Sequence, residues 1–181
     1  GFLEEFLALD RGPTVLDADA LNGLALNPDL WEHLGPQDVL TPHPGEMARL
    51  MELGTPDKPD NAAVQADRLG AAQALARERR VTVVLKGAAT VIAGPDGSTL
   101  ISPFSEPNLA VAGSGDVLAG LMGSLLAKRL SPLDAACLAV YLHGFCGRLL
   151  TSTHPTRGNL AREIAHALPR AITESLSITK E

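Results

Sequence analysis

The strongest constraint on the fold is a run of consecutive β-forming residues, Val81-Thr82-Val83-Val84-Leu85. A strand with one solvent-exposed face alternates apolar and polar residues, and this run does not. It therefore predicts a strand that is covered on both faces, which requires helices on both sides of the sheet. The expected class is α/β, with a mostly parallel sheet covered by helices.

Two shorter apolar runs, at 14–16 and 39–40, predict further strands. The first runs into Asp17-Ala18-Asp19, and the second is followed by the loop Thr41-Pro42-His43-Pro44-Gly45. The segments 90–93 and 98–101 flank Pro95-Asp96-Gly97, a turn signal that predicts an antiparallel hairpin at one edge of the sheet.

Helical periodicity accounts for most of the remaining chain. Helices are predicted over 2–9, 117–127, 133–150 and 160–176, and a further helix is predicted to begin at Ala20. Another is predicted to begin at Glu46, after Pro42 and Pro44, which disfavour an earlier start. A single helix from Asp60 to Arg79 is expected to bury one face, and the last helix is expected to carry an apolar stripe. The first face comprises Ala62, Ala66, Leu69, Ala72 and Ala76; the stripe comprises Leu160, Ile164, Leu168 and Ile172.

Composition limits the possible partners. The 181 residues carry a net charge of −6, so the basic surplus of a nucleic-acid-binding protein is absent. No uninterrupted apolar run approaches the ~18 residues of a membrane span, which argues against a membrane protein. Two cysteines, Cys137 and Cys146, face opposite sides of one predicted helix, so we expect reduced thiols in a cytoplasmic protein. The expected organisation is a single domain over 1–181.

The segment Gly113-Ser114-Gly115-Asp116 directly precedes an apolar helix. Two glycines let backbone N–H groups crowd around an anion, and the helix adds its positive N-terminal end, so a phosphate would fit. A β-branched side chain at Gly115 would crowd that phosphate and oppose a positive φ. Asp116 is either a helix N-cap or a base beside the transferred group.

Other polar residues follow the predicted strands, where α/β sheets collect ligands. Lys86-Gly87 ends the buried strand, and Lys86 is either a ligand contact or a solvated amine. His43 with Glu46 is a weak metal pair, because no third ligand follows, and His43 could instead cap the helix of Glu46. Asp17 and Asp19 could bind Mg²⁺ through water, and Asp19 could equally be a cap. No metal site is assigned.

Four blocks together resemble the bacterial ADP-dependent NAD(P)H-hydrate dehydratases of the ribokinase-like superfamily. They occur in the family's order, with Leu142-His143-Gly144 near the end. The four blocks are Val15 to Asn22, Leu40 to Glu46, Val84 to Ile92, and Gly113 to Gly120.

This resemblance implies a ribokinase-like fold and a hydro-lyase that repairs hydrated NADH or NADPH. The enzyme would use ADP, or ATP, with Mg²⁺ to phosphorylate the C6 hydroxyl, and phosphate would then leave. The matched positions imply that Asp116 is catalytic and that His43 and Asp116 contact the hydrated cofactor. The matched nucleotide positions are Lys86, Gly87, Ala88, Ala89, Thr90, Gly113, Ser114 and Gly115; residues with less certain roles are Asp17, Asp19, Asn22, Glu46 and Asn108.

The resemblance also implies a homo-oligomer and a functional link to an NAD(P)H-hydrate epimerase. Family members usually carry a further α/β segment upstream, so we expect this chain to be the C-terminal two-thirds of a longer domain. Two alternatives stay open: a small-molecule kinase of the same superfamily that acts on a vitamin precursor, and an inactive nucleotide-binding fragment.

Overall fold

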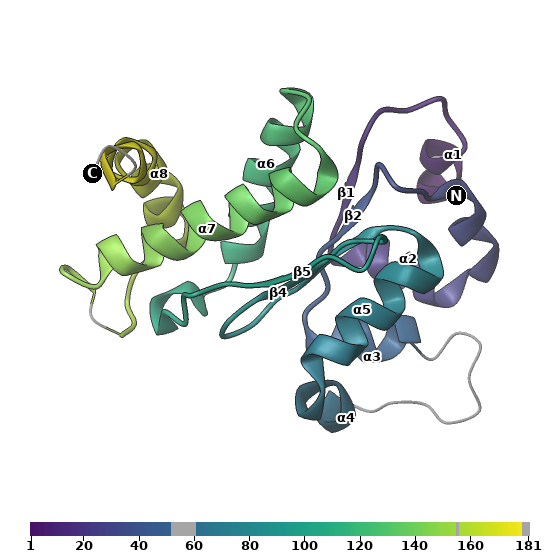
Figure 1. Cartoon of the computed structure of the whole chain (residues 1–181), viewed down its shortest axis with the longest axis horizontal. Coiled ribbons are helices and arrows are strands. Elements are labelled where there is room, and N and C mark those ends of the chain that lie inside the picture. The colour runs from purple at the N-terminus through teal and green to yellow at the C-terminus, as the bar shows by residue number, and fades with distance from the viewer. Residues whose placement is uncertain (52–60, 155, 179–181) are drawn as a thin grey trace.

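The computed structural model describes residues 1–51, 61–154 and 156–178. A sheet lies between two groups of helices, with α1 to α5 on one side and α6 to α8 on the other (Figure 1). The elements are α1 (Phe2–Leu7), β1 (Val15–Leu16), α2 (Asp19–Leu26), η1 (Pro28–His33), β2 (Val39–Leu40), α3 (Pro44–Met51), α4 (Asn61–Ala66), α5 (Arg68–Arg79), β3 (Thr82–Leu85), β4 (Val91–Ala93), β5 (Thr99–Ile101), η2 (Pro107–Leu109), α6 (Ser114–Ala127), α7 (Pro132–Leu150) and α8 (Ala161–Ile178).

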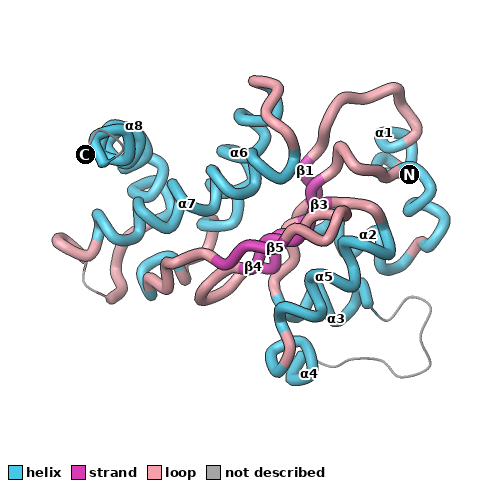
Figure 2. Tube along the Cα trace, in the orientation of Figure 1, coloured by secondary structure: helices cyan, strands magenta, loops and turns pink. Residues whose placement is uncertain are grey.

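The described strands form one sheet in the order β1-β2-β3-β4-β5. β1, β2 and β3 pair in parallel, whereas β4 and β5 pair antiparallel to their neighbours, so the sheet is mixed. The strands, magenta in Figure 2, lie between the two groups of helices. β4 and β5 are the expected hairpin, and β5 lies at the sheet edge with two of its three residues exposed. The buried strand predicted from 81–85 is β3, and all four of its residues are buried.

Alternate strand residues enter two separate cores, because successive side chains of a strand point to opposite faces. In β3, Val83 and Leu85 pack with α1 to α5, whereas Val84 packs with α6 and α7. Leu40 and Val39 of β2 divide between the cores in the same way. The continuous apolar run therefore reflects a strand whose two faces are both dry.

The prediction of one continuous helix over 60–79 is wrong. Within the described residues it is two helices, α4 and α5, because Asp67 ends the first and caps the second: its Oδ1 accepts a hydrogen bond of 2.8 Å from the N–H of Gly70. The break rotates the buried face. Ala72 and Ala76 are buried as expected, but Ala62, Ala66 and Leu69 are exposed; Val64, Ala71 and Leu75 are buried instead. The segment Pro56 to Pro59, which its prolines predict to be a surface loop, lies outside the described residues.

Two smaller predictions also need correction. α3 begins at Pro44 rather than Glu46, since proline is well tolerated in the first turn of a helix, where its missing N–H has no partner to lose. In α8 only Ile164 of the expected stripe is fully buried, and Ala171 is its buried companion. Leu160 and Ile172 are about half exposed.

The apolar sequence of α7 is interrupted by Asp134 and Arg148, so no uninterrupted apolar run of membrane-spanning length occurs in it, but the helix as a whole is long. It has 19 residues and is apolar enough to cross a bilayer by length and composition alone. However, 44% of its most apolar window is buried inside the fold, where it contacts α6, α8, β3 and β4. These contacts are those of a core helix. Cys137 and Cys146, both on α7, are free as expected.

Candidate functional site

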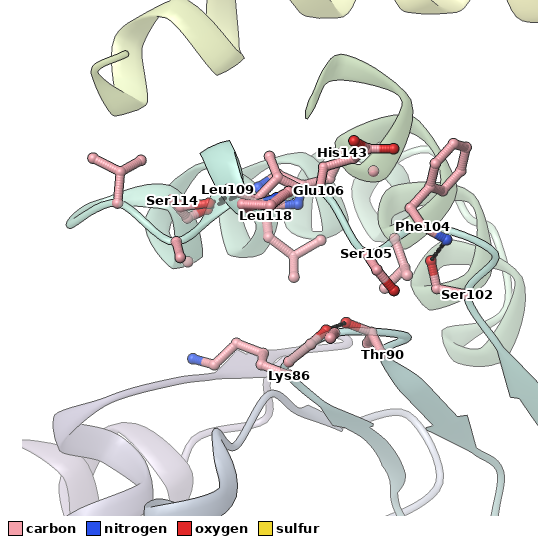
Figure 3. Close-up of a pocket in the computed structure, with 18 residues that line it drawn as sticks. Lys86, Thr90, Ser102, Phe104, Ser105, Glu106, Leu109, Ser114, Leu118 and His143 are labelled. Carbon is pink, nitrogen blue, oxygen red and sulfur yellow. Dashed lines mark hydrogen bonds between the residues drawn. The ribbon is translucent and has the colours of Figure 1, made fainter. Parts of the chain in front are cut away.

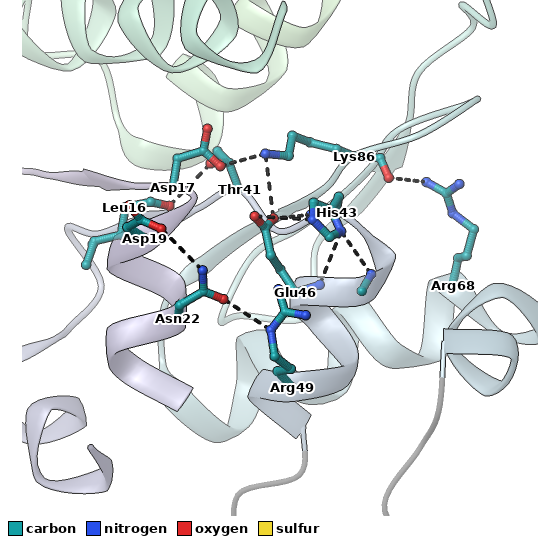
Figure 4. Close-up of polar contacts among 11 residues, drawn as sticks. Leu16, Asp17, Asp19, Asn22, Thr41, His43, Glu46, Arg49, Arg68 and Lys86 are labelled. Atoms are coloured by element: carbon teal, nitrogen blue, oxygen red, sulfur yellow. Dashed lines mark hydrogen bonds and ion pairs between the residues drawn. The ribbon is translucent and has the colours of Figure 1, made fainter. Parts of the chain in front are cut away.

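The ends of the three parallel strands bring distant charged residues together (Figure 4). Asp17 follows β1, His43 follows β2 and Lys86 follows β3. The N–H of Lys86 donates to the carbonyl of Pro42 at 2.8 Å, so these strand ends are direct neighbours. Lys86 Nζ lies 2.6 Å from Asp17 Oδ1 and 3.7 Å from Glu46 Oε2. One cation therefore serves two carboxylates.

His43 occupies the N-cap position of α3, because its carbonyl accepts the first helical hydrogen bond, from the N–H of Met47. Its Nδ1 accepts hydrogen bonds from the N–H groups of Gly45 at 3.0 Å and Glu46 at 3.2 Å. In return, Glu46 Oε2 accepts from the N–H of His43 at 2.7 Å. This reciprocal pair is the helix-capping role that the sequence left open. The imidazole still has 51% of its side-chain surface exposed, so it remains available to a ligand.

A second polar group, centred on Asn22, joins α2 to α3. The amide nitrogen of Asn22 lies 3.5 Å from Asp19 Oδ1, and its Oδ1 accepts from Arg49 Nε at 3.1 Å. Of the residues assigned less certain roles, Asp17 and Glu46 lie in the group around Lys86, and Asp19 and Asn22 lie in this second group. We call the first group, made of Asp17, His43, Glu46 and Lys86, the charged cluster.

A cleft of about 500 Å³ lies beside the charged cluster, between the end of β3 and the helices α6 and α7 (Figure 3). Its walls include most of the predicted nucleotide positions: Lys86, Gly87, Ala88, Thr90, Ser114 and Gly115. Ala89 and Gly113 do not line it. A Cβ placed on Gly115 would lie 3.6 Å from Lys86 Nζ and 3.5 Å from Asp17 Oδ2. The loop after β3 and the turn before α6 are therefore neighbours, and Lys86 belongs to both the cleft and the charged cluster.

The backbone of the 86–90 loop is tightly constrained. Gly87 has a φ of +144°, and Ala89 has a φ of +50° although it is not a glycine. Ala89 is held by a hydrogen bond from its N–H to the carbonyl of Phe104 at 3.1 Å. The guanidinium of Arg68 fills the space beside Gly87 and donates to the carbonyls of Leu85 at 3.0 Å and Lys86 at 3.4 Å. Burial lowers the pKa of Arg68.

The turn before α6 corrects one detail of the expected anion site. The positive φ, +84°, belongs to Gly113, and Gly115 has none. Gly115 is required for closeness rather than for backbone conformation, because Asp17 and Lys86 approach it. The N–H of Ser114 is already bonded to the carbonyl of Val111 at 3.1 Å, whereas the N–H groups of Gly115 and Asp116 have no backbone acceptor in the described chain. These two amides are free for an anion.

Asp116 is not the N-cap of α6, since Gly113 holds that position and Asp116 lies in the first turn. It is exposed and makes no hydrogen bond or ion pair within the ranges that the structure describes. It also does not line the cleft. A free carboxylate on the first turn, one residue past Gly115, has no structural partner to explain it, which leaves the role of a base open.

The sequence of this chain matches a known protein family over most of its length. The model of the NAD(P)H-hydrate dehydratase family matches residues 1–170. The chain belongs to this dehydratase family. The bifunctional NAD(P)H-hydrate repair enzyme Nnr of Moorella thermoacetica is 46% identical over 169 residues, which are 92% of this chain and 30% of that protein.

Solved structures agree with this assignment. The ADP/ATP-dependent NAD(P)H-hydrate dehydratase of Bacillus subtilis, co-crystallised with ATP and Mg²⁺ and soaked with CoA, is 33% identical with a TM-score of 0.74, over 90% of this chain and 56% of that one. A ribokinase-like superfamily protein of Enterococcus faecalis V583 is 26% identical with a TM-score of 0.76, over 96% and 57%. The ribokinase-like α/β class is thus confirmed. This chain spans less than a third of the Moorella protein and a little over half of each solved structure.

Several residues that line the cleft of this dehydratase-family chain were not predicted from the sequence motifs. Ser102, Phe104 and Glu106 line it from the segment after β5, and His143 lines it from α7. Arg148 stacks 4.6 Å from the centre of the Phe104 ring and pairs with Glu106 at 3.3 Å. Only His143 carried a sequence signal, as a buried polar residue within an apolar helix. Asn108 is 2% exposed and donates to the carbonyl of Gly147 at 2.7 Å, so it joins η2 to α7 outside the cleft lining.

The described residues contain no cluster of three or more His, Cys, Asp or Glu side chains that could hold a metal ion. Asp17 is paired with Lys86, and Glu46 is shared between Lys86 and His43. These carboxylates therefore do not form a dedicated Mg²⁺ site. They are compatible with Mg²⁺ that is bound mainly by the phosphate oxygens of a nucleotide and by water, with few protein ligands, as this ion most often binds.

Proposed function

We propose that this chain takes part in the ADP-dependent dehydration of hydrated NADH or NADPH. The observation that carries the proposal is the position of Lys86. Its ammonium lies in the wall of the cleft and within 3.7 Å of the charged cluster's Glu46. A phosphorylated nucleotide in the cleft and a polar substrate at the cluster would therefore meet at one cation, as a phosphoryl transfer requires.

Hydroxide is a poor leaving group, so the hydrate cannot lose water readily on its own. Transfer of a phosphoryl group from ADP to the C6 hydroxyl releases AMP, and the hydroxyl proton must go to a base. The C6–O bond of the phosphate ester then breaks as the ring nitrogen pushes its electron pair toward C6. Loss of a ring proton completes the reaction and yields NADH or NADPH and inorganic phosphate.

Each residue has a role that its surroundings permit. Asp116 would accept the hydroxyl proton, since no partner in the described chain engages its carboxylate. The free N–H groups of Gly115 and Asp116, with Lys86, would stabilise the charge that develops on the phosphoryl oxygens. The exposed face of His43 would contact the hydrated cofactor. Mg²⁺ bound to the nucleotide phosphates would neutralise part of their charge.

The Bacillus protein's name includes both ADP and ATP, and the Moorella protein's name describes a bifunctional repair enzyme. From these names we propose ADP, with ATP as a second donor, and a functional link to an epimerase. We further propose a homo-oligomer in the cytoplasm, consistent with two free cysteines on α7.

The test is to give the protein hydrated NADH, ADP and Mg²⁺ and to follow the absorbance of the reduced nicotinamide, beside a separate ADP titration. Growth of that absorbance with one AMP formed per NADH supports the proposal. ADP binding without turnover would favour a nucleotide-binding module that does not catalyse. The position of Asp116 outside the cleft lining is compatible with that outcome. Phosphate transfer to a small alcohol instead would favour a kinase.

A further inference from the structure

Ser114 and His143 form a buried pair in the wall of the cleft (Figure 3). Ser114 is the first residue of α6, and His143 lies within α7. They are 6% and 9% exposed. His143 Nε2 lies 3.1 Å from Ser114 Oγ and also 3.1 Å from the carbonyl oxygen of Ser114. Within the described residues, the hydrogen-bond contacts of the imidazole are thus to one residue, at two oxygens, and that residue belongs to the turn before α6.

These two distances fix the direction of the hydrogen bonds. A carbonyl oxygen can only accept, so Nε2 must carry the hydrogen that lies between it and Ser114. The imidazole is neutral near pH 7, because burial lowers the pKa of His143 to about 4. The same Nε2–H reaches Ser114 Oγ, and a nitrogen that donates to this oxygen cannot accept from it. Ser114 Oγ is therefore an acceptor toward His143, and its own hydrogen must point elsewhere.

The backbone of Ser114 is already engaged, which makes its side chain the only part free to meet a ligand. Its N–H is bonded to the carbonyl of Val111, and its own carbonyl accepts from His143. The hydroxyl hydrogen has no acceptor within the described residues, although the side chain is more than nine-tenths buried and lines the cleft. A buried donor without a partner is costly unless a ligand or water satisfies it.

We propose that the Ser114 hydroxyl donates a hydrogen bond to a phosphoryl oxygen of the nucleotide, and that His143 is the positioning residue that fixes the direction of this donation. The inference rests on the proposed function only for the ligand, a nucleoside diphosphate. The hydroxyl stands beside the free amides of Gly115 and Asp116, so it adds a third donor to them. A donor locked in direction before the ligand arrives loses little entropy on binding.

The first experiment compares ADP with adenosine, because the difference isolates the phosphates. Ser114→Ala should weaken ADP binding roughly 10-fold and leave adenosine binding unchanged, since a hydrogen bond to a charged oxygen is removed. Ser124→Ala is the matched control: Ser124 lies on the same helix and is exposed, and its hydroxyl donates to the carbonyl of Leu121. Unchanged ADP affinity in Ser114→Ala would overturn the proposal.

The second experiment tests His143 through its partner. His143→Phe should weaken ADP binding about as much as Ser114→Ala, and the double variant should lose little more, because both changes remove the same directed donor. His143→Gln keeps an N–H donor and should recover part of the affinity. Additive losses in the double variant would mean that His143 only braces α6 against α7, and would overturn its positioning role.

The third experiment needs no substitution that could unfold the protein. Nitrogen-15 NMR of the imidazole distinguishes the two neutral tautomers, and the Nε2–H form of His143 is expected at pH 7. The Nδ1–H form would overturn the proposal, because Ser114 would then donate to His143 and have no hydrogen left for a phosphate.

The results separate this inference from the proposed function. ADP binding that depends on Ser114 and His143, without turnover of hydrated NADH, would remove the dehydratase proposal and leave the inference standing. Turnover with ADP affinity unaffected by Ser114→Ala would do the reverse. A wild-type protein that fails to bind ADP would overturn both.

Discussion

Lys86 Nζ and Asp17 Oδ1 lie 2.6 Å apart although 69 residues separate them in the chain. The contact exists because β1 and β3 are both parallel to β2, so that their carboxyl ends meet at one edge of the sheet. Glu46 approaches the same ammonium at 3.7 Å. A cation that two partly buried carboxylates share is held in place, and it faces the cleft from a fixed position.

Loss of this cation should destabilise the protein. Lys86→Met leaves Glu46, whose side chain is 7% exposed, with an uncompensated charge, so the free energy of unfolding should fall by about 1–3 kcal/mol at pH 7. Urea denaturation measures this change, and Lys128→Met at an exposed position is the control. Adding Asp17→Asn should restore part of the loss; a double variant no more stable than Lys86→Met would contradict the shared-cation account.

Asp116→Asn should separate catalysis from folding. The first-turn position is exposed, so thermal stability and ADP affinity should stay near wild type, while turnover falls by about 10²-fold or more if Asp116 is the base. Asp134→Asn is a matched control, because Asp134 lies in the first turn of α7 and its change removes the same charge from a helix N-terminus. Wild-type kcat in Asp116→Asn would remove the catalytic role.

His43 has a capping role and an exposed imidazole, and two substitutions distinguish them. His43→Ala removes both, so it should lower stability by about 1 kcal/mol and raise KM for hydrated NADH. His43→Asn keeps an acceptor for the N–H groups of Gly45 and Glu46 and should restore the melting temperature but not the KM. If the asparagine variant recovers normal kinetics as well, His43 acts only as a helix cap.

Gly87→Ala tests the loop that follows β3. A Cβ there would lie 2.5 Å from Arg68 Nη1, and the φ of +144° is unfavourable for alanine, so we expect a loss of about 1–3 kcal/mol in unfolding free energy and weaker ADP binding. Gly120→Ala, within α6 and with no atom within 4 Å of the new Cβ, should instead gain about 0.5–1 kcal/mol. Equal stability in the two variants would contradict this account of the loop.

His143 should make the free energy of unfolding of the protein depend on pH. Its pKa is about 4 in the folded protein, and near 6.5 once exposed, so below pH 6.5 the unfolded chain binds the proton more readily. The contribution of the neutral, buried His143 to the free energy of unfolding is constant above pH 6.5. It is lost as the pH falls toward 4, by an amount on the order of 3 kcal/mol. Urea midpoints at pH 7 and 4.5 should differ more for wild type than for His143→Gln. His166→Gln, on an exposed position of α8, should behave as wild type.

Local sequence patterns predicted the strands, the edge hairpin and the three loops that carry polar residues. Val81 to Leu85 is apolar without alternation because both faces of β3 are covered. A proline or glycine directly follows, or lies one residue beyond, the observed end of β2, β3, β4 and β5, whereas β1 ends at Leu16 and is followed by Asp17 and Ala18 without one. The same local logic failed at Asp67, where a side chain that caps α5 interrupts a pattern that otherwise favours helix. Propensity alone does not show which of two competing hydrogen bonds such a residue makes.

What the sequence determined by itself is therefore the set of elements and the chemistry at their ends: Lys86-Gly87, His43 with Glu46, and the glycine turn before α6. Strand order, and so the meeting of Asp17 with Lys86, was decided by the tertiary structure, because parallel pairing brings together residues that no local pattern relates. The pair of Ser114 and His143 has the same origin. A buried hydroxyl and a buried imidazole on separate helices acquire a direction of hydrogen bonding only when packing places them 3.1 Å apart.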